Sequence, residues 1–342
     1  MRLSYLDYHT CGEPVRIVTG GYPELTGATI LDKRRQARDS HDQLRRAMML
    51  EPRGHAGMYG VIPVEASHPE AAFGVLFTHN EGYSTMCGHA TIALGRYAIE
   101  RGLVPAVEPV THFAIEAPCG LLRLACDVAD GKVGEVRFES VPAFVHARDR
   151  VVEVPGFGSV TTDIAYGGAF YCILPASRFG LDLFETPVEQ LTEAAAALTD
   201  TVRAGAPITH PAEPDLGFLY GTIVTDEAGP GETSFNLCIF AERQIDRSPT
   251  GSGVTARMAL DHAKGLLGLG RTRSFRSITG GRFSGRVLGP AAYPAEGAVT
   301  VEVGGLSYLA GEGAFIIEAD DPLGLGFALP ARFAEISPLR DG

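Results

Sequence analysis

The sequence predicts an α+β fold made of two similar lobes, each with β-strands wrapped around a central helix. Short strand-like segments lead to one helix, and this order occurs twice along the chain. A turn runs into a helix at Cys87-Gly88 and again at Thr250-Gly251, 163 positions apart (250 − 87), close to half of the 342 residues. A chain of this length also favours two lobes over one domain. We therefore expect two helix N-termini to face each other across a cleft.

The lobe boundaries follow from this division. The first lobe is expected over 1–158 and carries Cys87, and the second is expected over 159–322 and carries Thr250. The tail over 323–342 is expected to pack back on the first lobe.

In the first half, charged residues with apolar residues at helical spacing predict an amphipathic helix over 31–50. A second helix is expected to begin at or just after Cys87, because apolar Ile92, Leu94 and Tyr97 follow it and charged Glu100 comes after them. Strands are expected over 3–8, 14–19, 59–64, 71–79, 111–117, 120–126, 134–140 and 149–154.

In the second half, a segment rich in Ala, Glu and Leu predicts an amphipathic helix over 183–202, and the helix after Thr250 extends to about Leu267. The strands over 218–226 and 234–240 are expected to pair across the turn between them. The last strand, over 306–319, is expected to be interrupted at Gly311-Glu312-Gly313. Further strands are expected over 158–165, 169–174, 272–279, 282–288 and 298–303.

Composition excludes several classes of function. The formal net charge of −12 argues against nucleic-acid and anionic-membrane partners. The N-terminus lacks an apolar signal-peptide core and no window reaches the length of a membrane span, so we expect a cytoplasmic protein. Six cysteines occur without a CxxC pair, and His9, His55 and His89 are dispersed, so neither a disulfide framework nor a metal site is expected. The sequence does not report the oligomeric state, and a homodimer stays open.

Cys87 is the best candidate for a nucleophile or base. A thiol at a helix N-terminus lies beside unpaired N–H groups and the positive end of the helix dipole, and both favour the reactive thiolate. A Cys–His dyad with His89 is awkward, because residues i and i+2 do not share a helix face. The competing interpretation is an ordinary buried thiol, since free cysteine is among the most buried residue types.

Thr250 has a strong structural interpretation, because threonine is a good N-cap whose hydroxyl satisfies an unpaired N–H of the helix. Asp246 could likewise stabilise the helix dipole. The backbone N–H groups at the two N-termini are the chemically interesting donors, since they can hold a carboxylate. The residues that offer them are Gly88, His89, Gly251 and Ser252.

With these residues in view, the chain resembles the proline racemase family, which includes 4-hydroxyproline epimerases and trans-3-hydroxy-L-proline dehydratases. Two motifs together are highly specific to the family. They are Met-Cys-Gly-His at Met86–His89 and Asp-Arg-Ser-Pro-x-Gly at Asp246–Gly251. Further matching segments are 9–16, 52–55, 80–85, 166–168 with 170–171, and 252–257. The resemblance implies two lobes of the diaminopimelate-epimerase type and cofactor-free chemistry at the Cα atom of a small amino acid.

The resemblance also implies roles for the site residues. Racemases of the family place one cysteine in each lobe, on opposite faces of the substrate. Here the second position is Thr250, as in the dehydratase branch, and a threonine hydroxyl is far too weak an acid and base to exchange a Cα proton. A smaller departure is Gly57, where the family pattern has an Asp.

The implied reaction is loss of water from trans-3-hydroxy-L-proline, with Cys87 as the base and Δ1-pyrroline-2-carboxylate as the product. The N–H groups near Gly88-His89 and Gly251-Ser252 would hold the carboxylate, and Asp246 and His89 would contact the ring nitrogen. Thr250 would position substrate from the far face or cap its helix. The alternatives are a 4-hydroxyproline 2-epimerase or proline racemase, and a non-catalytic imino-acid binding protein.

Overall fold

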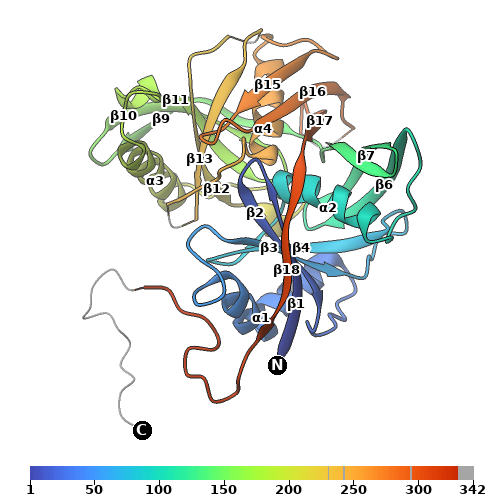
Figure 1. Ribbon diagram of the computed structural model, residues 1–342. Helices are drawn as coiled ribbons and strands as arrows, with labels where there is room; N and C mark the ends of the chain where they lie inside the picture. The colour runs from blue at the N-terminus through green and yellow to red at the C-terminus, as the bar shows by residue number, and fades with distance from the viewer. Residues whose placement is uncertain (230, 242, 293–294, 330–342) are drawn as a thin grey trace, which may run out of the picture.

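The computed structural model describes residues 1–229, 231–241, 243–292 and 295–329, and Figure 1 shows the path of the chain. The strands and helices predicted in the first half are all present, with the short β5 in addition. These elements are β1 (Arg2–Thr10), β2 (Glu13–Gly20), α1 (Ile30–Met49), β3 (Tyr59–Val64), β4 (Phe73–His79), β5 (Tyr83–Ser84), α2 (Gly88–Glu100), β6 (Val110–Ala117), β7 (Gly120–Ala129), β8 (Lys132–Glu139) and β9 (Phe144–Val154).

The second half also follows the predicted order, with two short 3₁₀ turns and the short strand β14 in addition. Its elements are β10 (Gly158–Tyr166), β11 (Phe170–Pro175), η1 (Ala176–Phe179), α3 (Val188–Ala204), η2 (Pro214–Leu216), β12 (Leu219–Thr225), β13 (Ser234–Phe240), β14 (Gln244–Ile245), α4 (Gly251–Ala263), β15 (Thr272–Arg276), β16 (Arg282–Pro290), β17 (Val299–Gly305) and β18 (Ser307–Ile316). The expected antiparallel pairing of β12 with β13 is confirmed.

Two helix boundaries differ from the sequence prediction. The helix α3 begins at Val188 and not at 183, because the side chain of Asp182 accepts the N–H groups of Phe184 and Glu185 and holds the preceding residues in a turn. The helix α4 ends at Ala263 and not near Leu267. Gly265 has a φ of +71°, and its N–H and that of the next residue donate back into the last helical turn, which is a Schellman motif.

The last strand also differs, because β18 runs without a break through Gly311-Glu312-Gly313. It pairs antiparallel with β1, and a one-residue bulge at Ala310 absorbs the irregularity in register. Figure 1 shows β18 beside β1, so 307–316 lie with the strands of the first lobe although the sequence pattern placed them in the second. Conversely, β9 pairs with β10, so 144–154 lie with the second lobe.

Each lobe has a central helix, as expected. The helix α2 packs against β1, β2, β7, β8 and β18, and α4 packs against β9, β10, β11 and β16. Both helices also contact β17, which pairs with β8 and joins the lobes. Most of α2, including Ile92 and Leu94, is fully buried, which is typical of a helix surrounded by strands.

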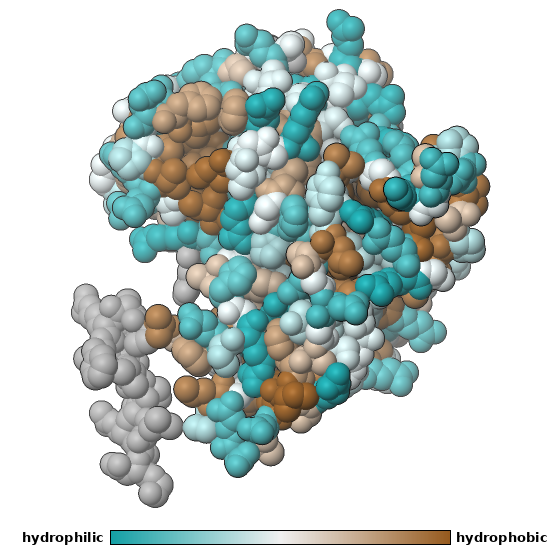
Figure 2. All heavy atoms as spheres, viewed as in Figure 1, coloured by the Kyte–Doolittle hydropathy of each residue, from teal (hydrophilic) through white to brown (hydrophobic). Residues whose placement is uncertain are grey.

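The surface is a mixture of polar and apolar side chains. Figure 2 shows hydrophilic and hydrophobic residues interspersed over one face, with the broadest brown group at the upper left and smaller ones elsewhere. Large exposed apolar side chains such as Val151, Phe184 and Tyr308 come from different elements. In the described part of the chain, no helix combines the length and apolar character needed to cross a membrane. Residues 330–342 of the tail lie outside the described residues, whereas Arg53 of the first lobe donates a hydrogen bond to the carbonyl of Gly324.

Candidate active site

The N-terminus of α2 brings Cys87 into the interior. Cys87 is the N-cap residue, its backbone is extended (φ −146°, ψ 110°), and its side chain is buried. The N–H of Ala90 donates to Sγ at 3.4 Å. The thiol therefore occupies the position of an N-cap acceptor, at the positive end of a buried helix.

Thr250 occupies the matching place at the N-terminus of α4, but it does not cap the helix with its side chain. Its backbone has φ +63° and ψ 94°, an uncommon conformation for a β-branched residue, whereas a capping side chain needs an extended backbone. The Thr250 hydroxyl instead donates to Oδ2 of Asp246 at 2.8 Å. The expected side-chain cap is thus wrong, and Asp246 holds this hydroxyl in place.

The two helix N-termini meet directly. A methyl group built on Gly88 would lie 2.4 Å from Cα of Gly251, and one built on Gly251 would lie 2.5 Å from Cα of Gly88. Side-chain carbons cannot approach that closely, so glycine is required at both positions. The two turns that are 163 positions apart in sequence therefore form one site.

A small cavity lies between the two turns. Its volume of about 10 Å³, counted as the space open to the centre of a water molecule, is about the least that admits one water. The lining residues are Tyr59, Met86, Cys87, Gly88, His89, Tyr171, Tyr220, Phe240, Asp246, Thr250, Gly251 and Ser252. They include every site residue predicted from the sequence.

Cys87 and His89 form a close pair, with Sγ 3.1 Å from Nδ1. The sequence argument against such a dyad is wrong, because Cys87 is an N-cap with an extended backbone and the helix-face rule does not apply to it. Burial raises the pKa of the Cys87 thiol well above its usual value, although the Ala90 N–H opposes this. Burial also lowers the pKa of His89 to about 4. In this buried site both shifts favour the neutral forms, and for Cys87 burial acts against the thiolate that the helix N-terminus favours.

A buried network positions the turn that carries Asp246 and Thr250. Oδ1 of Asp246 accepts the N–H of Ser248 at 2.7 Å. The carbonyl of Pro249 accepts the side-chain N–H of Asn236 at 2.7 Å, and Asn236 accepts in turn from Arg257 at 2.6 Å. Burial lowers the pKa of Arg257 to about 10, so it is a cation at neutral pH and its charge strengthens the bond to the amide.

A second contact ties the same turn to the first lobe. Glu13 of β2 is fully buried and accepts both the backbone N–H and Nε of Arg247, at 2.7 and 2.8 Å. The Arg247 guanidinium also donates to the carbonyl of Gly57 at 2.6 Å. Gly57 has a φ of +75°, and a Cβ there would lie 2.4 Å from the guanidinium. The glycine that departs from the family pattern thus faces this cation.

Several of these residues were not predicted as site residues. Arg257 and Tyr171 fall inside the motifs that carry the resemblance, so the motifs were the signal for them. Nothing local in the sequence marks Tyr59 or Asn236, whose roles come from the strands β3 and β13 that place them against the two helix ends.

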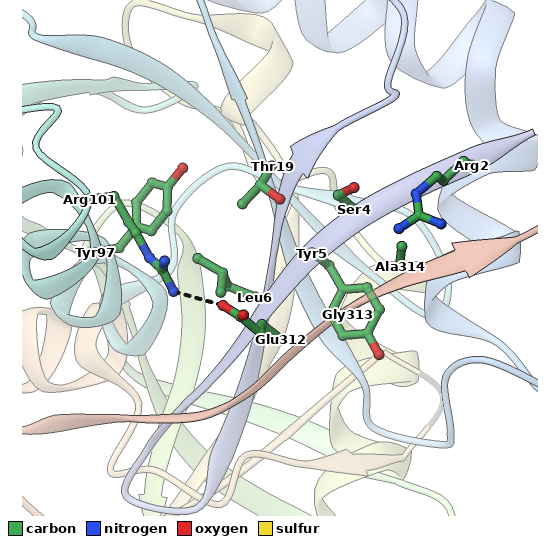
Figure 3. A pocket seen from close by; sticks show the side chains of 10 residues that line it. All are labelled: Arg2, Ser4, Tyr5, Leu6, Thr19, Tyr97, Arg101, Glu312, Gly313 and Ala314. Atoms are coloured by element: carbon green, nitrogen blue, oxygen red, sulfur yellow. Dashed lines mark hydrogen bonds and ion pairs between the residues drawn. The ribbon is translucent and has the colours of Figure 1, made fainter.

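A larger hollow lies elsewhere, on the surface of the first lobe between β1, β18 and the end of α2. It measures about 520 Å³, and Figure 3 shows Arg101 and Glu312 paired across it. The two side chains are exposed and lie 3.2 Å apart. None of the predicted site residues lines it, and it holds no cysteine or histidine. In the ranges that the structure describes, no group of three or more His, Cys, Asp or Glu residues is arranged to hold a metal ion.

Comparison with known proteins agrees with this geometry. A family model described as "Proline racemase" matches residues 5–328. A human protein named trans-3-hydroxy-L-proline dehydratase is 52% identical, over 96% of this chain and 94% of its own length. A Xenopus tropicalis protein named trans-L-3-hydroxyproline dehydratase is 51% identical, over 96% and 95%. The crystal structure of a hydroxyproline epimerase from Agrobacterium vitis with bound trans-4-hydroxy-L-proline superimposes with a TM-score of 0.89 at 27% identity, covering 96% of each chain. The expected two-lobed α+β fold is confirmed.

Proposed function

This chain belongs to the proline racemase family, and on that premise we propose that it is a hydro-lyase that removes water from trans-3-hydroxy-L-proline. The main observation behind the proposal is that the two helix N-termini carry different side chains. Cys87 brings a thiol to the N-terminus of α2, and Thr250 brings a hydroxyl to the N-terminus of α4. The relatives named for this reaction support it, because they match the chain over nearly its whole length.

The first step is binding of the substrate between the lobes. The N–H groups of Gly88-His89 and Gly251-Ser252 hold the carboxylate, since both helix N-termini point their positive ends at the same place. Asp246 faces the ring nitrogen, together with His89. Because each oxygen of Asp246 already accepts one hydrogen bond, the carboxylate is fixed in place and keeps further lone pairs for the substrate N–H.

The second step is removal of the Cα proton. The positively charged ring nitrogen of the substrate offsets the burial that keeps Cys87 neutral and favours its thiolate. His89, 3.1 Å from the sulfur, orients it. The thiolate takes the Cα proton, and the N–H groups around the carboxylate stabilise the negative charge that develops.

The third step is loss of the 3-hydroxyl. In the trans isomer the hydroxyl lies on the ring face opposite the carboxylate, which is the face of the Cα hydrogen. The protonated Cys87 is therefore on the correct side to pass its proton to the leaving oxygen. The C2=C3 enamine that remains tautomerises to Δ1-pyrroline-2-carboxylate, and a second thiol is unnecessary.

Thr250 is what separates this site from a two-base racemase. Inversion needs a group on the far face that can deliver a proton to Cα. A threonine hydroxyl is a very weak acid, and the hydroxyl of Thr250 already donates a hydrogen bond to Asp246. Thr250 therefore positions Asp246 and the substrate, and the far face stays without a proton donor of useful strength.

A substrate screen tests the proposal. The protein is incubated separately with L-proline, trans-4-hydroxy-L-proline, trans-3-hydroxy-L-proline and cis-3-hydroxy-L-proline, and the products are identified by NMR. We expect pyrroline-2-carboxylate from the trans-3 isomer and far less from the cis-3 isomer, whose hydroxyl lies on the face away from Cys87. Epimerised 4-hydroxyproline or proline as the main product would show a racemase or epimerase instead, and binding without any turnover would show a binding protein.

A further inference from the structure

One hydroxyl in the site has no partner among the described residues. Tyr59, the first residue of β3, is buried, and its OH group makes no well-formed hydrogen bond to the described part of the chain, although it lies near the Cys87 thiol and the Ser84 hydroxyl. Leaving a buried hydroxyl without a hydrogen bond costs about 1–3 kcal/mol. A hydroxyl at the wall of a substrate cavity can bear this cost because the bound substrate supplies the missing hydrogen-bond partner.

The position of Tyr59 is well defined. Its ring lies edge-on to that of His89, with centroids 4.8 Å apart, and stacks on that of His79 at 6.1 Å. The strand β3 is paired with β2 and β4, both in the first lobe. Tyr59 therefore approaches the cavity from the same lobe as Cys87, and the two line it together.

The hydroxyls of Tyr171, Ser252 and Thr250, which also line the cavity, are already engaged. The Tyr171 OH shares a 2.7 Å hydrogen bond with Ser252, and the Thr250 hydroxyl donates to Asp246. Both come from the second lobe. Tyr59, from the first lobe, can donate a hydrogen bond to a substrate group on the Cys87 side of the ring.

We propose that the Tyr59 hydroxyl recognises the 3-hydroxyl of the substrate and donates a hydrogen bond to it as it leaves. This rests on the proposed function. The 3-hydroxyl and the Cα hydrogen share one ring face, so a base and a leaving-group donor are both needed on the Cys87 side, and Tyr59 lies there.

The step balances with the groups that Cys87, Tyr59 and the substrate supply. The Cα–H bond breaks and its proton goes to the Cys87 sulfur, while its electron pair forms the C2=C3 bond. The C3–O bond breaks, and the departing oxygen takes the proton from Cys87 and leaves as water, which regenerates the thiolate. Tyr59 keeps its own proton and stabilises the negative charge on the oxygen through its hydrogen bond. Burial raises the pKa of Tyr59 well above its usual value, so the group remains a donor at neutral pH.

The test compares Tyr59→Phe with the wild-type protein in deuterated water. We expect the rate of pyrroline-2-carboxylate formation to fall by about 100-fold, the effect typical of one lost donor to a developing oxyanion. Proton removal from Cα stays intact, so deuterium accumulates at Cα of the recovered substrate. The variant should fold normally and keep or raise its melting temperature, because the lost hydroxyl has no hydrogen bond to the described chain. Tyr22→Phe is the matched control, since its OH is also buried and unpaired within the described residues but lies outside the site.

Three outcomes overturn the assignment of Tyr59. They are an unchanged elimination rate, an equal loss in Tyr22→Phe, and a loss of elimination without deuterium in the recovered substrate, which would place Tyr59 at the Cα step. A wild-type protein that forms no pyrroline-2-carboxylate overturns the proposed function itself, and Tyr59 with it. Failure of the variant alone and failure of the function are thus distinguishable.

Discussion

The hydroxyl of Thr250 donates a 2.8 Å hydrogen bond to Oδ2 of Asp246, and both groups are buried at the N-terminus of α4. The positive φ of Thr250 turns this side chain away from the N–H groups of its own helix. The residue that stands where a racemase has its second cysteine is therefore part of the support for the carboxylate of Asp246. In the proposed mechanism, this arrangement leaves a proton-carrying thiol on one face of the substrate only.

Replacing Thr250 by Cys should bring in some epimerisation, because a thiol then faces Cα from the second lobe. The measurement is chiral analysis of L-proline and trans-4-hydroxy-L-proline after long incubation. Thr250→Ser is the matched control, since it keeps the hydroxyl for Asp246 and should keep dehydration without epimerisation. Unchanged products in Thr250→Cys would contradict the role given to this position.

Replacing Cys87 by Ser should lower the rate of dehydration at least 1,000-fold, because the hydroxyl of serine is a far weaker acid and does not form the anionic base. Binding of trans-3-hydroxy-L-proline, measured by calorimetry, should persist because the backbone N–H groups remain. Cys119→Ser, a change at a half-buried cysteine outside the cavity, should keep activity. Substantial dehydration by Cys87→Ser would remove the thiol from the mechanism.

Gly57 offers a test of the contact between the lobes. Ala at this position meets the Arg247 guanidinium and has to adopt the left-handed conformation, so Gly57→Ala should destabilise the protein by about 1–2 kcal/mol. Asp tolerates that conformation better and brings a carboxylate to the cation, so Gly57→Asp should cost less. Urea unfolding of the two variants measures the difference. A larger loss for Asp than for Ala would show that the new carboxylate does not pair with Arg247.

The stability of the protein should fall on acidification because of His79. Burial lowers its pKa to about 3 in the folded protein, against roughly 6.5 when unfolded. Between these values the unfolded chain binds a proton that the folded one does not, so the free energy of unfolding falls by about 1.4 kcal/mol for each pH unit below 6.5. Urea unfolding at pH 7, 6 and 5 measures this. His79→Phe keeps the aromatic packing and should reduce the slope by that amount, whereas an equal slope would rule out the contribution of His79.

Much of the fold was predictable from the sequence because its signals are local. Hydrophobic periodicity placed the helices α1 and α2 and most strands to within a few residues. The position of β18 was not predictable, since pairing with β1 depends on contacts about 300 residues apart in sequence. The expected division at 158 stays a prediction, and pairings such as β9 with β10 and β18 with β1, which cross this position, cannot be read from a local pattern.

The site residues that lie in sequence motifs were predictable, whereas the contacts that depend on the backbone conformation of single residues were not. Cys87, Gly88, Thr250 and Gly251 meet as expected from their two turns. The Cys87–His89 contact and the Thr250–Asp246 bond depend on backbone angles of single residues, and residue types do not report these angles. The raised pKa of the thiol comes from its burial between the lobes, which the helix-dipole argument did not include.

The most direct test of the account is a single incubation of the wild-type protein with trans-3-hydroxy-L-proline in deuterated water, followed by NMR and chiral analysis. A thiol on one face alone predicts conversion to Δ1-pyrroline-2-carboxylate, with no D-configured 3-hydroxyproline formed. Accumulation of the Cα-deuterated D-configured isomer without pyrroline would contradict it, because a second proton donor would then have to act from the Thr250 side.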